Sequence, residues 1–538
     1  MKSATVRLAT SVILTAIFAA LGMNAASPAQ AAGYVPISGA GSTWSQNALD
    51  QWRRNVDQFG IRVNYQGTGS SDGRNQFRNG TVDFAVSEIP YGLKDGSVID
   101  QPPTRKYAYM PIVAGGTSLM YNLTISGKRV TNLRLSGLTV AKIFTGVIKS
   151  WNDPAIKADN PGLSMPSRRI VPVVRSDGSG TTAQMTAYLA KQYPSVWNSY
   201  CAKAGRSTPC GQTSTYPIVS GGGFTAQAGS LGVSGYVSQE QNVGTITYVE
   251  YSYALNTGYP VAKLLNKSGY YVEPTANNTA VGLQGVKINT NPSSSAYLTS
   301  DLTGVYNNSD RRAYPMSSYS YMVIPTKIEG TLNANKGKTL GAFAYYFLCE
   351  GQRQAPVLGY SPLPLNLVQA GLAQVRRIPG VEAKTIDIKK CNNPTFSPDG
   401  KNLLAKNAPQ PQSCDKQGAT QCATGTGGAA KTSTSVSPSV SPSVSPSGST
   451  SAPTTNGGST GTTGTTGGTT STGGTGQTTV SGDSGQGIPT VNGTAVALPV
   501  SNKWGLEQAA MVFAAIALLV VLIAPPLVAR RLSAGTKK

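Results

Sequence analysis

The stretch that most constrains the fold is RSDGSGTT, residues 175–182, because it stands between two regular elements. The apolar run 170–174 before it is typical of a buried strand, and the run 183–190 after it is typical of a helix. A Gly/Ser/Thr turn at a helix start leaves backbone N–H groups free at the positive end of the helix dipole, which favours bound anions. Arg175 adds a guanidinium that can hold two oxygens, and Asp177 can hold that guanidinium in place. A capped surface loop is the ordinary alternative.

Two further turns have the same character. Residues 39–43 read Gly-Ala-Gly-Ser-Thr and precede a helical pattern over 44–52. Residues 67–73 read Gly-Thr-Gly-Ser-Ser-Asp-Gly and lie between a strand-like run at 61–65 and a helical stretch that begins at Arg74. None of these turns ends in the Gly-Lys-Ser/Thr of a nucleotide-binding loop. Three such turns that converge would suit a small tetrahedral oxyanion.

The N-terminus has the pattern of a secretory signal peptide over residues 1–31. Two basic residues, Lys2 and Arg7, precede an apolar run, and Ala29-Gln30-Ala31 is a small-residue cleavage site. We therefore expect an exported protein whose mature chain begins near Ala32.

The C-terminal part has the pattern of a single membrane anchor. The apolar segment 507–529 is long enough to span a bilayer, and the basic tail 530–538 that follows it predicts a cytoplasmic end. We expect the rest of the protein to lie on the extracellular face of the membrane. Residues 498–502 weakly resemble a sortase sorting signal, so covalent attachment to the wall is the alternative.

A long uncharged segment precedes this anchor. Between Lys431 and Lys503 the only charged residue is Asp483, and the segment consists largely of Ser, Thr, Gly and Pro. Such a composition buries too little apolar surface to offset chain entropy, so residues 432–502 are predicted to be a disordered linker. Residues 406–431 form a short cysteine-containing tail between the linker and the globular part.

The charge balance is strongly basic. Without residues 1–31 and 503–538 the chain keeps 38 basic and 22 acidic residues, a formal charge of +16. Such a surface attracts anions and anionic wall polymers. Nucleic acid is a poor partner for it, because no basic cluster is interleaved with aromatic residues and the chain is exported.

The chain has six cysteines and no histidine. In an oxidising compartment an even number of cysteines favours disulfides. Proximity along the chain suggests the pairs Cys201–Cys210 and Cys414–Cys422, which leaves Cys349 for Cys391. A zinc site is the alternative, but the spacings contain no CxxC pair. Without histidine a Ser-His-Asp triad is excluded, so a phosphatase or serine hydrolase is a poor interpretation, and no metal or cofactor is expected.

From residue 34 to about 405 the composition is globular, and strand patterns alternate with helical patterns. This alternation predicts an α/β fold with a mostly parallel or mixed sheet, divided into two domains. The predicted strands are 81–86, 108–113, 117–123, 245–251 and 319–325, and the predicted helices are 140–144, 182–192, 223–230, 251–257 and 340–349.

The turns and strands resemble those of the phosphate-binding proteins that serve phosphate ABC transporters. The matching segments, in the family's order, are GAGSTW (39–44), VNYQGTGSSDG (63–73), GTVDFAVSEIP (80–90), VVRSDGSGTT (173–182) and GTITYVEYSYA (244–254). The resemblance implies a periplasmic-binding-protein fold of type II, with two α/β lobes joined by a two-strand hinge. Lobe one would comprise 34–113 plus 318–405 and lobe two 114–317, with crossovers near 113–118 and 313–319.

The resemblance also implies a set of ligand residues for inorganic phosphate. Asp177 takes the place of the residue that orients the ligand arginine. Two departures from the family pattern are Glu88, where the family usually has Asp, and Trp44, where it usually has Phe. The implied phosphate ligands are Thr43, Trp44, Ser70, Glu88, Arg175, Ser179, Gly180 and Thr181.

A carboxylate in an anion site makes physical sense only if the ligand carries a proton. Phosphate near neutral pH has at least one O–H, whereas sulfate has none. A buried Glu88 would accept a hydrogen bond from phosphate but would leave sulfate facing an unpaired negative group, at a cost of several kcal/mol. We therefore expect extracellular phosphate capture for delivery to the membrane permease of an ABC importer. A wall or adhesion protein, or a phosphate sensor or scavenger with the same fold, are the alternatives.

Overall fold

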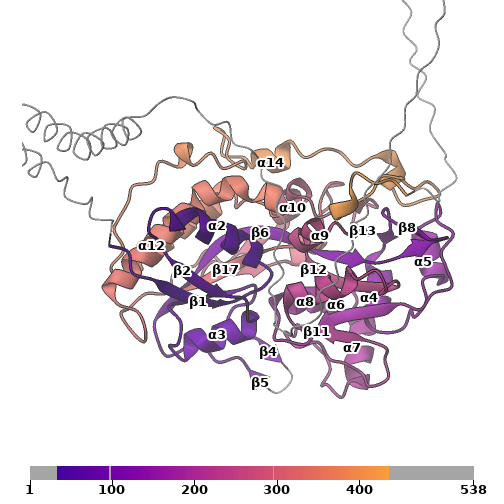
Figure 1. The fold of residues 1–538 in the computed structure, drawn as a ribbon, viewed down its shortest axis with the longest axis horizontal. Helices are drawn as coiled ribbons and strands as arrows, with labels where there is room; N and C mark the ends of the chain where they lie inside the picture. Colours follow the sequence, from indigo (N-terminus) through magenta and orange to yellow (C-terminus); the bar gives the residue numbers. More distant parts are fainter. Residues whose placement is uncertain (1–32, 96–97, 295, 435–538) are drawn as a thin grey trace, which may run out of the picture. The chain divides into compact units, whose positions relative to one another are not determined.

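The computed structural model describes residues 33–95, 98–294 and 296–434. One mixed sheet of 11 strands runs through this part of the chain (Figure 1). Three short strands, β13 (Val261–Leu265), β14 (Tyr271–Val272) and β9 (Arg134–Leu135), join it beside β6. The main path is β11 (Thr225–Gln227), β10 (Val171–Arg175), β12 (Thr245–Glu250), β6 (Tyr107–Tyr121), β17 (Ser317–Pro325), β3 (Phe84–Ser87), β1 (Ile37–Gly41) and β2 (Val63–Gln66).

Strand β6 connects the two ends of the sheet. It pairs antiparallel with β17 from Tyr107 to Gly116, and with β12 from Thr117 to Tyr121. The prediction of two separate strands here was wrong, because Gly115 and Gly116 are not a turn. A Cβ at Gly115 would lie 2.7 Å from the Trp44 ring. Glycine therefore serves close packing inside a continuous strand.

The remaining strands form two parallel groups. At one end β1 pairs parallel with both β2 and β3, and at the other end β10 pairs parallel with both β11 and β12. Parallel strands need crossover connections, and helices supply them on both faces of the sheet. Figure 1 shows α2 (Gln46–Asp57) and α12 (Ala334–Leu348) on one side of the first group and α3 (Ser70–Arg78) on the other.

Helix α2 illustrates how the sequence sets the packing. Its buried residues Ala48, Leu49, Trp52 and Val56 recur at helical spacing and form one apolar face. Trp52 has no exposed surface and stacks on Phe347 of α12, with ring centroids 5.3 Å apart. This face anchors the helix, so the turn before it has a fixed position.

Most predicted elements are confirmed with shifted ends, but the helix predicted at 223–230 was wrong. Residues 225–227 instead extend the sheet as β11, beside Val173–Arg175 of β10, and the next helix begins only at Gly229. The other helices are α4 (Gly137–Phe144), α5 (Pro154–Asp159), α6 (Gly180–Gln192), α7 (Pro194–Lys203), α8 (Gly229–Val237), α9 (Tyr251–Thr257), α10 (Ala276–Gly282), α11 (Thr303–Tyr306), α13 (Leu365–Val375) and α14 (Leu403–Lys406). Three two-stranded sheets lie outside the main sheet: β4 (Lys94–Asp95) with β5 (Val98–Ile99), β7 (Thr124–Ile125) with β8 (Lys128–Arg129), and β15 (Lys287–Ile288) with β16 (Ser300–Asp301).

All six cysteines form disulfides, which removes the zinc alternative. The bonds join Cys201 to Cys210, Cys349 to Cys391, and Cys414 to Cys422. The last of them closes a loop in the tail that follows α14.

This tail is docked on the protein rather than loose. The buried Arg134 guanidinium donates to the carbonyls of Cys414 and Thr420, each at 2.9 Å, and Lys263 pairs with Asp415 at 2.8 Å. Contacts continue beyond the predicted tail boundary, since Thr434 is only 4 % exposed and accepts from the Thr131 backbone N–H. In Figure 1 the tail, drawn in orange, runs from α14 toward β8.

None of the helices within the described ranges is long and apolar enough to cross a bilayer. The predicted signal peptide (1–31), the membrane segment (507–529), the cytoplasmic tail (530–538) and the linker beyond residue 434 lie outside the described residues.

Candidate functional site

Polar side chains gather at the carboxyl ends of the parallel strands, where open α/β sheets bind their ligands. We call one side the first wall: it consists of the turn 42–45 after β1, the start of α3, Glu88 after β3, and Ser320 on β17. The second wall consists of Arg175 at the end of β10, the turn 176–179, the start of α6 and the start of α8.

Glu88 is the centre of the first wall. Its side chain is almost fully buried, at 2 % exposure. Oε1 accepts hydrogen bonds from Ser42 Oγ at 2.5 Å and Ser320 Oγ at 2.6 Å, and Oε2 accepts one from Ser70 Oγ at 2.7 Å. A carboxylate offers about four acceptor positions, so these three neutral donors leave room for a further donor.

Arg175 is the centre of the second wall and is also 2 % exposed. Its Nε donates to Asp177 Oδ1 at 2.7 Å and its Nη2 donates to Asp177 Oδ2. Its Nη1 lies 3.3 Å from Thr181 Oγ1 and 3.4 Å from Ser230 Oγ. The guanidinium is thus held in one orientation, with one edge turned toward hydroxyl groups.

Asp177 is fixed as firmly as the arginine that it orients. Its Oδ1 also accepts from the Gly229 backbone N–H at 2.9 Å. Burial raises the pKa of Asp177, but the hydrogen bonds and charge of Arg175 outweigh it, so that the pKa lies below its ordinary value. The carboxylate therefore stays ionised near neutral pH.

The start of α6 brings the two walls into contact. The Gly180 backbone N–H donates to Ser70 Oγ at 3.1 Å, and a Cβ on Gly180 would lie 1.9 Å from Glu88 Oε2. Only glycine allows this approach. Ser179 caps the helix, since its Oγ accepts from the Thr182 N–H at 3.1 Å.

Thr43 connects the first wall to α8. Its Oγ1 lies 2.9 Å from Ser230 Oγ and accepts from the Ser230 N–H at 3.1 Å. The Trp44 N–H points back into its own turn and donates to Ser42 Oγ at 3.0 Å, and the Trp44 ring is fully buried beside Thr117. Trp44 thus supports the site from behind.

The walls also touch outside this cluster. Ser71 donates through its backbone N–H to the Gly178 carbonyl at 3.0 Å, and Gln184 Nε2 donates to the Glu88 carbonyl at 2.9 Å. The structure therefore has the two walls closed against each other. Hydrogen bonds link Glu88, Ser70 and Gly180 in one network. A second network links Arg175, Asp177, Thr181 and Thr43, the last through Ser230.

Sequence reasoning missed three hydroxyl groups of the cluster. Ser42 lies inside the Gly-Ala-Gly-Ser-Thr turn and was available from that motif. Ser230 was hidden inside the wrongly predicted helix, although Ala-Gly-Ser before an apolar run repeats the pattern of the other turns. Ser320 has no local signal, because only the pairing of β17 with β3 brings it to Glu88.

Comparisons with known proteins show which family this chain belongs to. The family model described as "PBP superfamily domain" matches residues 24–350. "Phosphate-binding protein PstS" of Xylella fastidiosa (strain Temecula1) is 32 % identical over 336 residues, which cover 62 % of this chain and 83 % of that protein. The protein of the same name from Pasteurella multocida is 31 % identical over 341 residues, or 63 % of this chain and 89 % of that protein.

A mycobacterial relative and a solved structure are also similar. "Phosphate-binding protein PstS 2" of Mycobacterium tuberculosis is 30 % identical over 345 residues, covering 63 % of this chain and 85 % of that protein. The solved structure of a periplasmic phosphate-binding protein (PfluDING) covers 65 % of this chain and 100 % of its own, with 18 % identity and a TM-score of 0.48. That structural likeness is weak, and the assignment rests on the sequence matches: the chain belongs to the PBP superfamily and, within it, to the PstS family of phosphate-binding proteins.

Proposed function

We propose that this protein captures inorganic phosphate between the two walls of the site. The observation that carries the proposal is the position of Glu88 in the same buried cluster as Arg175. An anion beside a buried carboxylate is stable only if it donates a hydrogen bond to that carboxylate, and phosphate can do so because it carries an O–H. The names of the relatives support the same ligand.

Each residue of the set has a proposed part. Arg175 supplies the countercharge, and Asp177 orients it. Glu88 accepts a hydrogen bond from the ligand's O–H, and its serine partners hold its longer side chain in place. The proposed neutral donors are Thr43, Trp44, Ser70, Ser179, Gly180 and Thr181. The N–H groups of Trp44 and Gly180 donate to Ser42 and Ser70 in this structure, so they would have to exchange these partners for the ligand.

The two walls belong to two proposed lobes, 34–113 plus 318–405 and 114–317. Strands β6 and β17 run between them and would act as the hinge. Release of the ligand requires the contacts between Ser71 and Gly178, and between Thr43 and Ser230, to open.

We further propose that the bound phosphate is delivered to the permease of an ABC importer, as the family assignment suggests. The segments 1–31 and 507–529 would place the folded part on the extracellular face of the membrane, tethered by the linker. Surface display also suits the alternative role of a sensor or scavenger.

Calorimetric titration of the purified protein with phosphate, arsenate and sulfate tests the ligand. We expect phosphate and arsenate to bind, because both carry a proton near neutral pH, and sulfate to bind roughly a thousandfold more weakly. Equal binding of sulfate, or no heat with phosphate, would refute the proposal. Normal phosphate uptake by cells that lack the protein would leave binding intact but favour the sensor or scavenger role.

A further inference from the structure

A second group of cations lies at the other end of β10. A cavity of about 200 Å³ opens there beside Ile170 and Pro172, and Lys149 and Arg169 line it together with Gly221 and Gly222 of the glycine-rich turn 220–223. The five residue steps from Ile170 to Arg175 span about 16 Å in an extended strand, so this cavity is separate from the site that contains Arg175.

Glycines pack against Arg169, which lines this cavity, and against its chain neighbour Arg168. A Cβ on Gly223 would lie 2.1 Å from Arg169 Nη2, so the guanidinium rests directly against the glycine backbone. A Cβ on Gly244 would lie 3.2 Å from Arg168 Cδ, so the stem of Arg168 packs there. The positive φ angles of both glycines, +79° and +104°, also exclude most other residues.

Lys149 is held next to them by the backbone. The Ile170 N–H donates to the Lys149 carbonyl at 2.8 Å, and Ser150 forms a bridge with Arg169. All three cationic side chains are exposed. Within the described ranges, none of the three forms an ion pair with a carboxylate, in contrast to Arg175, which is held by Asp177.

We propose that Lys149, Arg168 and Arg169, with the turn 220–223, form a second anion site that binds successive phosphate groups of a polyanion. Several exposed cations on one rim suit several linked charges, whereas a single small ion is bound better in a dry site such as the cleft. A guanidinium matches two oxygens of a phosphate group, and the glycine-rich turn lets a chain approach the backbone closely. This site is independent of phosphate capture in the cleft.

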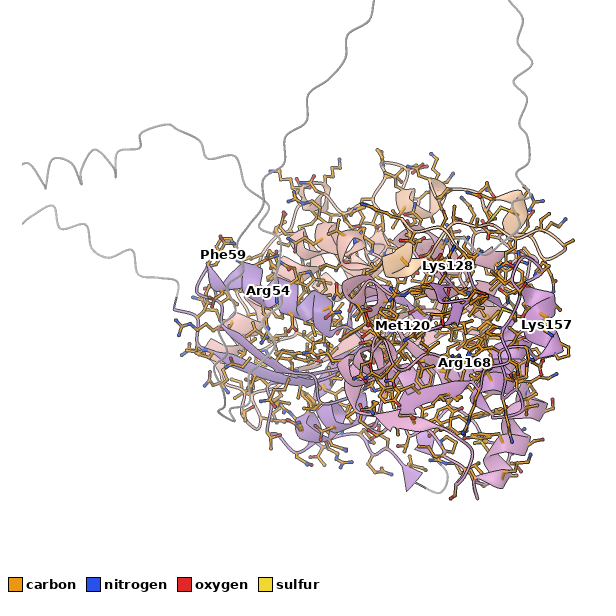
Figure 2. The ribbon with its side chains drawn as sticks, turned by 45° about the vertical axis from the view of Figure 1, so that its right-hand side comes forward. Arg54, Phe59, Met120, Lys128, Lys157 and Arg168 are labelled. Carbon is orange, nitrogen blue, oxygen red and sulfur yellow. A yellow bond between two sulfur atoms is a disulfide. The ribbon has the colours of Figure 1, made fainter. Side chains whose placement is uncertain are left out.

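Binding of short-chain inorganic polyphosphate to the full-length protein tests the proposal. We expect binding that weakens steeply with salt, and the double variant Arg168→Gln, Arg169→Gln should bind roughly tenfold more weakly. The matched control Lys128→Gln, Lys157→Gln removes the same charge from exposed positions that do not line the cavity, and it should stay within about twofold. Figure 2 labels Lys128, Lys157 and Arg168.

The outcomes distinguish this site from the cleft and from nonspecific attraction by the net positive charge of the protein. Arg175→Ala should lose orthophosphate binding but keep polyphosphate binding, and the Arg168/Arg169 variant should do the opposite. Equal weakening in the two double variants would overturn the proposal, because the net charge alone would then explain binding. Equal affinity for polyglutamate would overturn the phosphate specificity.

A variant that keeps every charge tests the geometry. Gly223→Ala places a methyl group on the Arg169 guanidinium and should weaken polyphosphate binding several-fold. Gly205→Ala is the matched control, since Gly205 has a similar φ of +73° but nothing within 4 Å of its Cβ position. If both variants bind as the unchanged protein does, the arginine is not held for binding and the proposed site is wrong.

Discussion

The two walls of the cleft hold their central charges in opposite ways. Glu88 is surrounded by three neutral hydroxyl groups, whereas Arg175 is held by a full carboxylate, Asp177. With two carboxylates and one guanidinium, these three groups carry a negative formal charge even though we propose that an anion binds between them. Attraction to these three groups alone therefore does not account for binding. The ligand must be held by directed hydrogen bonds, including the one that it donates to Glu88.

The largest effect should come from the wall that carries the cation. Arg175→Ala removes the guanidinium of the second wall and leaves Asp177 buried without its partner, so phosphate affinity should fall roughly a thousandfold or more. Calorimetry measures the affinity. Arg175→Lys keeps the charge but loses the paired bonds to Asp177, and should give an intermediate loss. Affinity within tenfold of the unchanged protein in Arg175→Ala would contradict the role of this wall.

The second effect should come from the carboxylate of the first wall and should change selectivity. Glu88→Gln keeps an oxygen for Ser42 and Ser320 but replaces the other oxygen with an N–H donor. Sulfate would then meet a donor instead of an unpaired charge, and discrimination between phosphate and sulfate should fall roughly a hundredfold. Competition titrations with phosphate and sulfate measure this discrimination.

Glu88→Asp is the matched control for that change. It keeps the proton acceptor and shortens the side chain, so discrimination should persist while affinity falls as bonds to the serines lengthen. If Glu88→Gln still rejects sulfate as strongly as the unchanged protein, the proton explanation is wrong.

The difference between the walls also explains what the sequence could predict. Arg175, Asp177 and Ser70 come from short turns at helix starts, where residue type and local order reveal the chemistry. Ser320 comes from the middle of a strand, and only the register with β3 brings it to Glu88. A partner that depends on strand pairing has no local signal.

The same limit explains two errors outside the site. Two strands, 108–113 and 117–123, were predicted where the chain forms one, and the Trp44 ring occupies the space that a Cβ on Gly115 would need. The disordered linker was predicted to begin at residue 432, but Thr434 is buried and accepts from the Thr131 backbone N–H. In both cases a residue distant in the chain decides the structure, so composition and periodicity could not show it.

A smaller effect should follow from removing the charge of Asp177, the residue that orients the Arg175 guanidinium. Asp177→Asn keeps the shape but loses the charge that orients the guanidinium, and phosphate affinity should fall about tenfold. Because the pKa of Asp177 lies below its ordinary value in the folded protein, its stabilising effect is present above the ordinary value and is lost as the pH falls through the lowered pKa. Unfolding of both proteins by denaturant should therefore differ near neutral pH and converge in acid. A constant difference at every pH would contradict the ion pair.

The smallest effect concerns a third carboxyl group. Within the part of the chain that the structure describes, it has neither the three serine hydroxyl donors that surround Glu88 nor a charged partner such as Arg175 has in Asp177. Glu250 lies behind the site at the end of β12 and is fully buried, and its Oε1 has no hydrogen-bond partner among the described residues. Its Oε2 accepts a bond from the Ser252 N–H at 2.7 Å. Burial raises the pKa of Glu250 well above its ordinary value, and the hydrogen bonds around it offset this only in part.

The sign of its pH dependence is opposite to that of Asp177. A carboxyl group with a raised pKa stabilises the fold fully below its ordinary pKa, and this stability is lost as the pH rises through the raised value. The free energy of unfolding of the unchanged protein should therefore fall, as the pH rises from the ordinary carboxyl range through the raised value, by more than that of Glu250→Gln, with a difference on the order of 1 kcal/mol. Glu240→Gln, at an exposed position, is the control and should follow the unchanged protein. Parallel curves for Glu250→Gln and the unchanged protein would contradict the raised pKa of Glu250.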